Sequence, residues 1–365
     1  MAATPSLVCS AAGCCCATKD TILTQSAGIP GAMLVGCLCY CFITSFLENF
    51  VMRYLSIINF AFSAFILTII NLSFVDYAQS EVIDEKPCFS NGWSKAKFLE
   101  LKDNHFSLSR STIQELLPQL RYCLASNDPV IRDEVAFGAY STWLRADLIG
   151  KPELSSLFET LLSDIAQNKD DEHSVFGPFV VLVFSEVLRV DRKVPYLQPE
   201  QRTEAVNILS SYILMANDYR GFDEQLGWRH SVAHASDAVL QLVLNPRISP
   251  LQLQQMLNAI ARQVRAKEAH FYIYSEPERL ARPVYYAMRR GDVPIAYWKQ
   301  WINDVAAPSP FNHWAEVFTS EQGLAQRHNV KSFLLNLRNF ISLGKNNEQL
   351  TELDMAVQQA LKTMI

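Results

Sequence analysis

Apolar residues recur every three to four positions along almost the whole chain after Ser94. Stretches such as QELLPQLRYCL and SSLFETLLSDI place their apolar side chains on one face of an α-helix. No alternating run of β-branched residues between hairpin turns predicts a strand, and FVVLVF at 179–184 continues into SEVLRV at helical spacing. The pattern predicts helices over residues 111–126, 129–148, 152–168, 175–191, 200–217, 228–244, 250–267, 277–290, 294–306, 330–343 and 347–363.

Several of these segments begin with residues that are typical of helix starts. Asp128-Pro129, Ser249-Pro250 and Glu276-Pro277 place a polar residue before a proline at the first helical position, whereas Pro118 predicts a kink or a restart. Short polar turns between helices favour antiparallel pairs, and pairs recur at about 40 residues, as in HEAT and armadillo proteins. We therefore expect an all-α fold, a HEAT- or armadillo-like α-solenoid, although no crisp sequence repeat is visible.

The first 80 residues differ from the rest because they contain two uncharged apolar runs, at 31–47 and 55–75. The second run is long enough to span a bilayer. A methionine and an arginine precede it, at Met52 and Arg53, and small residues stand before Glu81 as at a cleavage site. This layout predicts a secretory signal peptide over 52–80, and an uncleaved membrane anchor is the alternative because the apolar run is longer than usual.

Export from Met52 would make residues 1–51 an upstream extension and 81–365 the mature helical domain. Alternatively Met1 is the true start, and the two apolar runs anchor the chain in a membrane. Contact with a membrane is then expected only through residues 31–75. Both interpretations place the protein, or its helical domain, outside the cytoplasm or at a membrane.

Seven of the nine cysteines lie in the first 80 residues, where CCC and CLCYC lack the spacing and the histidine partners of a zinc site. We interpret these as small hydrophobic residues. Cys88 and Cys123 remain in the helical domain. An oxidising compartment would allow them to form a disulfide, and two free thiols are the alternative.

Composition narrows the possible functions. The 365 residues are 49% hydrophobic and 19% charged, which is enough to build a core. The net charge of −5 and the lack of a long basic run argue against a nucleic-acid partner. No nucleophile elbow, phosphate-binding loop, dinucleotide fingerprint or CxxC motif occurs.

The segment DYRGFDEQLGWRHSVAHASD, residues 218–237, departs from the plain helical pattern. Gly221 and Gly227 offer the backbone freedom of a sharp turn, and we expect a helix from about Trp228 to Leu244. On a wheel of roughly 100° per residue, His230, His234, Asp237 and Gln241 form one stripe and valines lie opposite. The helix is therefore expected to be amphipathic.

Four interpretations of this stripe stay open: a solvated face, a structural network, a binding edge and a metal site. The binding edge would hold a protein or a small polar ligand, with an arginine pairing an anion. Its residues would be Asp218, Arg220, Trp228, His230, His234 and Asp237. The metal site would use His230, His234 and Asp237 to hold a divalent ion.

A second polar cluster is YSEPERLARPV, residues 274–284. Glu278 and Arg282 are spaced for a pair on one helix surface. If helices pack in sequence order, this cluster lies on the same edge as Arg220 and His230. A solvated salt-bridge ladder is the simplest interpretation, but Glu278 is also a candidate catalytic base for a metal-dependent enzyme.

These motifs resemble a bacterial family catalogued as domain of unknown function 2785. The likeness covers about residues 116–301 and includes DPVIRDEVAFGAYSTWL and DEHSVFGPFVVLVFSEVLRVDR. The family pattern of acid-x-Arg-Gly followed by Gly-Trp-x-His-x-x-Ala-His-x-x-Asp matches here at Asp218, Arg220, Gly221, Gly227, Trp228, His230, His234 and Asp237. Pro178 stands where the family often carries an arginine. The resemblance implies a HEAT-like helical domain and no established activity.

The sequence thus predicts an exported helical-repeat protein that acts as a binding module through the polar edge at 218–237. The alternative is a metal-dependent hydrolase with a His/His/Asp site. Whether the protein is an enzyme stays open.

Overall fold

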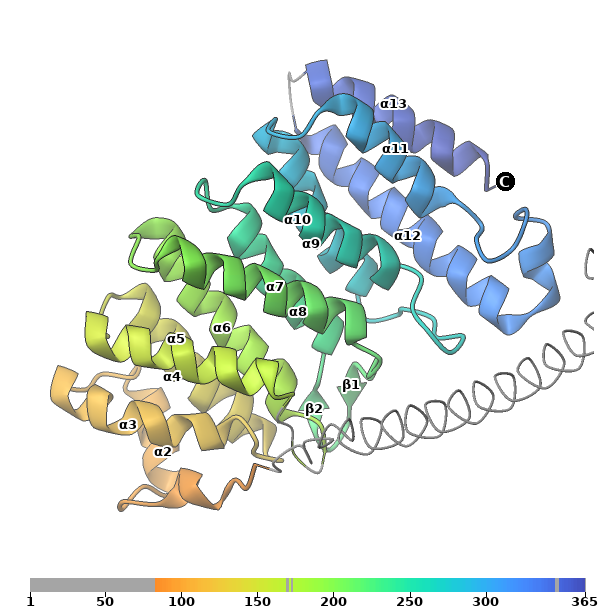
Figure 1. Cartoon of the computed structure of the whole chain (residues 1–365). Helices are drawn as coiled ribbons and strands as arrows, with labels where there is room; N and C mark the ends of the chain where they lie inside the picture. The colour runs from red at the N-terminus through yellow and green to blue at the C-terminus, as the bar shows by residue number, and fades with distance from the viewer. Residues whose placement is uncertain (1–82, 169–170, 172, 345–347, 365) are drawn as a thin grey trace, which may run out of the picture. The chain divides into compact units, whose positions relative to one another are not determined.

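The computed structural model describes residues 83–364, except 169–170, 172 and 345–347. The described residues fold as successive α-helices with a single small hairpin among them (Figure 1). The helices are α2 (Lys95–Asp103), α3 (Arg110–Cys123), α4 (Gly138–Arg145), α5 (Lys151–Ala166), α6 (Phe176–Lys193), α7 (Pro199–Met215), α8 (Ser231–Val243), α9 (Pro250–Gln263), α10 (Glu276–Arg290), α11 (Ile295–Ala306), α12 (Glu321–Leu343) and α13 (Glu348–Lys362). The predicted all-α class is confirmed.

From α5 onward the helices form two layers, as Figure 1 shows. One layer runs α6, α8, α10, α12, and the other runs α5, α7, α9, α11, α13, each helix packing on the next of its own layer. Helices that follow each other in sequence also pack across the layers, as α5 does on α6 and α7 on α8. This is the stacked helix-pair architecture of a HEAT-like solenoid.

The layer that contains α6 and α8 is the more deeply buried, since α6 buries 12 of its 18 residues and α7 of the other layer 6 of its 17. The run FVVLVF at 179–184 lies within α6, which confirms that it forms a helix rather than a strand, and all of it except Leu182 is buried. Large side chains with no exposed surface, such as Phe158, Phe184 and Trp298, fill the space between layers.

The structure differs from the predicted boundaries in several places. The range 129–148 is a π-helix, Val130–Phe137, which leads directly into α4. Helix α2 was not predicted, and α12 begins at Glu321 rather than at 330. Helix α3 runs on through Pro118 without a restart. Two short 3-10 helices also occur, at Lys86–Phe89 and Glu316–Thr319.

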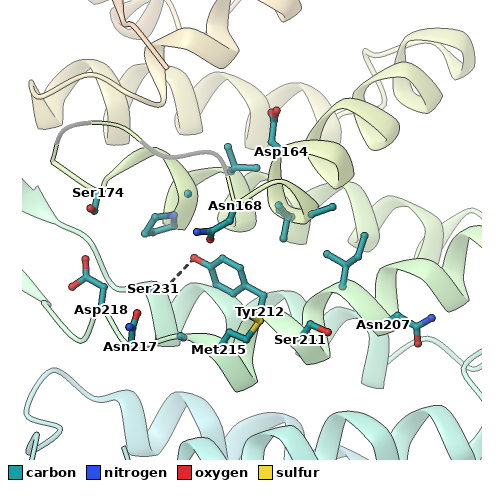
Figure 2. A pocket seen from close by; sticks show the side chains of 17 residues that line it. Asp164, Asn168, Ser174, Asn207, Ser211, Tyr212, Met215, Asn217, Asp218 and Ser231 are labelled. Carbon is teal, nitrogen blue, oxygen red and sulfur yellow. Dashed lines mark hydrogen bonds between the residues drawn. The ribbon is translucent and has the colours of Figure 1, made fainter. Parts of the chain in front are cut away.

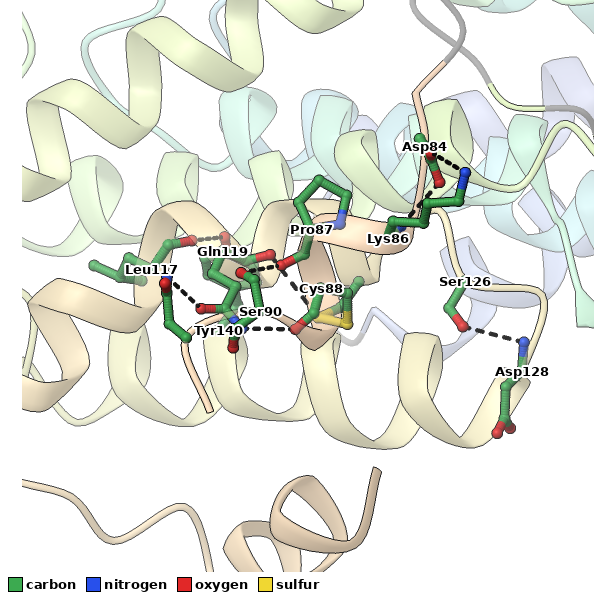
Figure 3. Close-up of a disulfide and its surroundings, with 12 residues drawn as sticks. Asp84, Lys86, Pro87, Cys88, Ser90, Leu117, Gln119, Ser126, Asp128 and Tyr140 are labelled. Carbon is green, nitrogen blue, oxygen red and sulfur yellow. Dashed lines mark hydrogen bonds and ion pairs between the residues drawn. A yellow bond between two sulfur atoms is a disulfide. The ribbon is translucent and has the colours of Figure 1, made fainter. Parts of the chain in front are cut away.

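Cys88 and Cys123 form a disulfide that joins the first 3-10 helix to the end of α3 (Figure 3). Both cysteines are fully buried, and the amide of Gln119 donates to the carbonyl oxygens of Cys88 at 2.7 Å and Ser90 at 3.0 Å. Of the two alternatives left open by the sequence, the structure shows the paired one.

None of the helices in the described part of the chain is both long and apolar enough to cross a membrane. The apolar runs at 31–47 and 55–75, and the expected cleavage site before Glu81, lie outside the described residues.

Candidate functional site

The segment at 218–237 forms a β-hairpin before the helix, which the sequence did not predict. Strand β1 (Phe222–Asp223) pairs antiparallel with β2 (Gly227–Trp228). The carboxylate of Asp223 closes the tip because it accepts the backbone N–H groups of Gln225 at 2.9 Å and Leu226 at 2.8 Å. The expected helix start at Trp228 is therefore wrong, since helix α8 begins at Ser231.

Both glycines of the segment lie where a larger side chain would clash with a neighbouring element. A Cβ atom at Gly221 would lie 2.0 Å from the ring of Tyr274, in the turn before α10. Gly227 has a φ of +70°, and a Cβ there would lie 2.9 Å from the side chain of Pro129. The hairpin is thus pressed against two elements that are distant in sequence.

Arg132, on the π-helix, forms hydrogen bonds to the backbone of the hairpin. Its side chain is fully buried and donates to the carbonyl oxygens of Leu226 at 2.6 Å and Trp228 at 3.3 Å. The guanidinium also donates to Ser126 O at 3.1 Å and lies 4.7 Å from the centre of the Phe179 ring. Arg132 therefore connects the hairpin to the π-helix and to α6.

The carboxyl group of the neighbouring Asp133 has a strongly shifted pKa. Its carboxylate lies 2.7 Å from Nε of Arg132, although the two groups are not aligned as a hydrogen bond. Burial raises the pKa of Asp133 to about 6, and the positive charge of Arg132 opposes that rise. The pair is an electrostatic contact under the hairpin.

The two histidines lie in different local structures. His230 precedes α8 and adopts a left-handed backbone with φ of 55°, while its carbonyl accepts the N–H of His234 at 2.9 Å. His234 is buried in α8, and its Nδ1 lies 3.2 Å from Pro178 O, so Nδ1–H donates to this carbonyl. The ring centres of the two histidines are 5.9 Å apart.

Both imidazoles favour the neutral form. Burial lowers the pKa of His234 to about 3, and the nearby His230 adds to the effect. Burial also lowers the pKa of His230 to about 4, with a smaller contribution from the positive charge of Arg279. Neutral rings suit the aromatic stack in which they lie: Trp228 is centred 4.1 Å from His230, and Phe179 meets His234 edge-on at 5.1 Å.

Asp237 faces helix α10, where Arg279 forms a two-pronged ion pair with it; Nε donates at 3.0 Å. Gln241 accepts from Arg192 of α6 at 3.1 Å. The expected stripe is therefore not a solvated face opposite a valine core, because α8 is packed between α6 and α10.

The possible metal site can be compared with this geometry. Among the residues that the structure describes, no three His, Cys, Asp or Glu side chains are grouped to hold a metal ion. His230, His234 and Asp237 are thus not arranged as a metal centre, and Asp237 is occupied by Arg279. Metal binding stays a prediction that rests on the sequence alone.

The cluster at 274–284 lies beside the hairpin, as the sequence led us to expect. The ring centre of Tyr274 is 5.9 Å from that of Trp228. Glu278 pairs with Arg282 at 2.9 Å, with both side chains more than a third exposed, so this pair is the expected surface contact. The buried acid is Glu276, whose Oε2 accepts the N–H of Tyr274 at 2.9 Å and whose pKa burial raises.

A cleft of about 600 Å³ opens between the start of α6 and the end of α7 (Figure 2). The hydroxyl groups of Tyr212 and Ser231 lie 3.0 Å apart on its wall, and Met215 is 72% exposed beside them. Figure 2 shows Asn217 and Asp218 together at one end of this cleft.

A second cavity, of about 490 Å³, begins at the same two residues and runs under the hairpin to the segment before α10. Asp218 and Arg220 form a two-pronged ion pair at its mouth, with Nε to Oδ1 at 2.8 Å. Burial acts to raise the pKa of Asp218, but the hydrogen bonds from Arg220 outweigh it and leave the pKa below its usual value. The arginine expected to pair an external anion is therefore paired within the chain.

Residues 161–338 match the model of a family described as "Protein of unknown function (DUF2785)". The resemblance to DUF2785 is confirmed. The DUF2785 match covers just under half of the 365 residues; it begins later than the resemblance read from the motifs and extends further, into α12. No curated protein and no solved structure matches the chain.

The sequence analysis missed several residues that shape the site, above all Arg132 and Arg229, together with Phe222 and Tyr274, whose rings both contact Trp228. A basic residue in a turn is typical of a solvated surface, so nothing local marked the two arginines as buried. The one available signal was the position of Arg229 inside the motif at 218–237, which lies within the match to DUF2785, whereas Arg132 lies outside that match.

Proposed function

We propose that this protein is a binding module whose ligand lies at the edge formed by the hairpin, the end of α7 and the segment before α10. The observation that carries the proposal is that two cavities meet at Asn217 and Asp218, within the most distinctive motif of the chain. Ligand sites are commonly concave, largely preformed and lined by apolar groups with a few placed polar ones.

Exposed apolar side chains support a contact surface at this edge. Phe222 is 49% exposed, Trp228 39% and Ile273 68%. Single exposed apolar residues are normal on protein surfaces, but a group of them beside a cavity indicates a binding site. The buried Arg132 keeps the hairpin in place, so this surface is organised before any ligand arrives.

We also propose that the helical domain works after export, as the signal-peptide layout at 52–80 predicts. The disulfide between Cys88 and Cys123 supports this proposal, because disulfides form and persist mainly in oxidising compartments. Mass spectrometry of the N-terminal peptide from the native host would test it. A start at Glu81 supports export with cleavage, and a retained residue 1 would contradict the proposed start at Met52.

The binding proposal can be tested with a fragment library observed by ligand NMR on the purified full chain. The library should contain carboxylic acids, amines, sugars and neutral aromatic amides. The edge variant combines Phe222→Ala and Ile273→Ala, which are exposed and therefore cost little stability. The matched control combines Leu251→Ala and Leu343→Ala, which are 76% and 68% exposed on other helices.

We expect fragments to bind the wild type and the control and to bind the edge variant weakly. Fragments that bind all three proteins equally would place binding elsewhere and refute the proposal. A library with no binder of any class would also count against it.

A further inference from the structure

Arg229 is a buried arginine whose side chain forms no hydrogen bond or close ion pair with the residues that the structure describes, although its charge acts on Asp218 and Asp223. It follows β2, its backbone N–H donates to Gly221 O at 2.9 Å, and the residue is only 7% exposed. Its Nε atom is sealed from solvent and has no hydrogen-bond partner within the described part of the chain. The terminal nitrogens likewise form no hydrogen bond to described residues, but they are not sealed, because Arg229 lines the cavity of about 490 Å³.

Such an arginine is unusual because a guanidinium carries five N–H donors and cannot lose its charge. Other buried arginines use their terminal nitrogens: those of Arg132 donate to three carbonyls although its Nε is also without a hydrogen bond, and Arg202 forms a bidentate pair with Asp191. Burying a cation without a hydrogen-bonded counter-ion costs stability, so the unused donors of Arg229 need a reason. An anionic ligand in the cavity supplies one.

The cavity wall near Arg229 is aromatic. Tyr219 stacks on His270 with ring centres 4.9 Å apart, and Tyr274 lines the same cavity. The Nε2 atom of His270 is also buried without a partner among the described residues. A ligand here would therefore contact aromatic rings and also side-chain nitrogen atoms of Arg229 and His270 that lack hydrogen-bond partners among the described residues.

The acidic residues of the wall restrict the kind of anion. Asp218 is engaged by Arg220, and Asp223 accepts backbone N–H groups at the hairpin tip. Glu268 is exposed on the wall and is a further acceptor. These three carboxylates face two arginines, so the wall disfavours a dianion and favours a single negative charge accompanied by N–H or O–H donors.

Resting on the proposed binding function, we infer that Arg229 holds the carboxylate of a ligand that also carries hydrogen-bond donors, as an amino acid or the C-terminal residue of a peptide does. The guanidinium matches a carboxylate in a two-pronged geometry, and Glu268 lies on the same wall to accept the donors. The volume falls within the range of about 300–1,000 Å³ typical of small-ligand sites.

The experiment measures binding of matched probes to the full chain by ligand NMR and by the rise in melting temperature. Phenylalanine and phenylalaninamide differ only in the carboxylate, and N-acetylphenylalanine lacks the ammonium group. Glycylglycylphenylalanine tests a peptide end against the free amino acid, and phenyl phosphate tests a dianion. The variants are Arg229→Gln, Glu268→Gln and, as a charge-matched control, the exposed Arg262→Gln.

We expect phenylalanine or the tripeptide to bind the wild type and the Arg262→Gln control, and the amide not to bind. Arg229→Gln should weaken binding by about 10- to 100-fold, the usual effect of losing a hydrogen-bonded charge. Its melting temperature without ligand should equal or exceed that of the wild type, because the change removes an unpaired buried charge. Glu268→Gln should weaken the probes that carry an ammonium group and leave N-acetylphenylalanine unchanged.

Several results would overturn the inference. They are equal binding of acid and amide, unchanged binding to Arg229→Gln, tighter binding of phenyl phosphate, or no binding of any probe. A melting temperature lowered by Arg229→Gln would assign the residue a structural role instead. If neutral or cationic fragments bind and the edge variant with Ala at 222 and 273 loses them, the binding module stands and only the carboxylate assignment falls.

Discussion

Replacing His234 by asparagine should make the protein less sensitive to acid. The imidazole is buried and neutral in the folded state, with a pKa of about 3, whereas the unfolded chain has the ordinary value of 6.5. As the pH falls below 6.5, the unfolded state binds a proton that the folded state does not, so stability falls until the folded pKa is reached. Asparagine keeps a donor near Pro178 O and removes the titration.

The magnitude follows from the two pKa values. At about pH 5 the unfolded imidazole is almost fully protonated and the folded one is not, which costs the wild type about 2 kcal/mol relative to neutral pH. The variant should lack this loss. Its stability at neutral pH should be lower by about 1–3 kcal/mol because the smaller side chain leaves a gap against Phe179.

The assay is urea unfolding followed by circular dichroism at several values between about pH 7.5 and pH 5. Acids that titrate in the same window act in the opposite direction. Burial raises the pKa of Asp133 to about 6, so its protonation stabilises the folded state as the pH falls. Because wild type and variant share Asp133, the difference between their pH profiles isolates His234.

His105→Asn provides the control, since this histidine is exposed. Equal pH profiles for wild type and His234→Asn would refute the reasoning, because they would mean that His234 is protonated at the same pH in both states.

Three further predictions concern stability. Gly221→Ala should lower stability by about 1–3 kcal/mol, because its Cβ would overlap the Tyr274 ring, and Tyr274→Ala in the same chain should recover part of that loss in a double-mutant cycle measured by urea unfolding. Reduction of the disulfide between Cys88 and Cys123, which are 35 residues apart, should cost about 3–4 kcal/mol, seen as a melting temperature that dithiothreitol lowers in the wild type and leaves unchanged in the double alanine variant. Arg132→Met should cost about 3–5 kcal/mol and speed hydrogen exchange of the hairpin amides; unchanged exchange would show that the hairpin does not depend on Arg132.

The helices were predictable because a helix that packs against a second layer needs apolar residues along one face. Those residues recur every three to four positions in the sequence. The hairpin was not, since each strand has two residues and leaves no alternating pattern. The helical wheel failed at His230 for a related reason: it assumes helical backbone, and His230 lies outside the helix with a positive φ.

The two buried arginines were beyond the reach of sequence patterns because their environment is assembled from distant segments. Arg132 and Leu226 are 94 residues apart, yet their contact fixes the hairpin. The disulfide was also undecidable from spacing, since pairing depends on how close the backbones come, here 4.8 Å between Cα atoms. The motif at 218–237, by contrast, departs from the plain helical pattern in the structure as in the sequence, although Arg220, expected to pair an external anion, pairs with Asp218.

The disulfide makes the two ends of the stack unequal. In a solenoid each helix pair packs only against its neighbours, so a pair at the end has about half the packing contacts of an inner pair and unfolds first. At one end Cys88 is locked covalently to α3, whereas no cysteine follows Cys123 in the sequence to fasten α13. Among the described helices, thermal or mechanical unfolding should therefore start from α13 rather than from α3 and travel toward the hairpin, which lies between them in the chain.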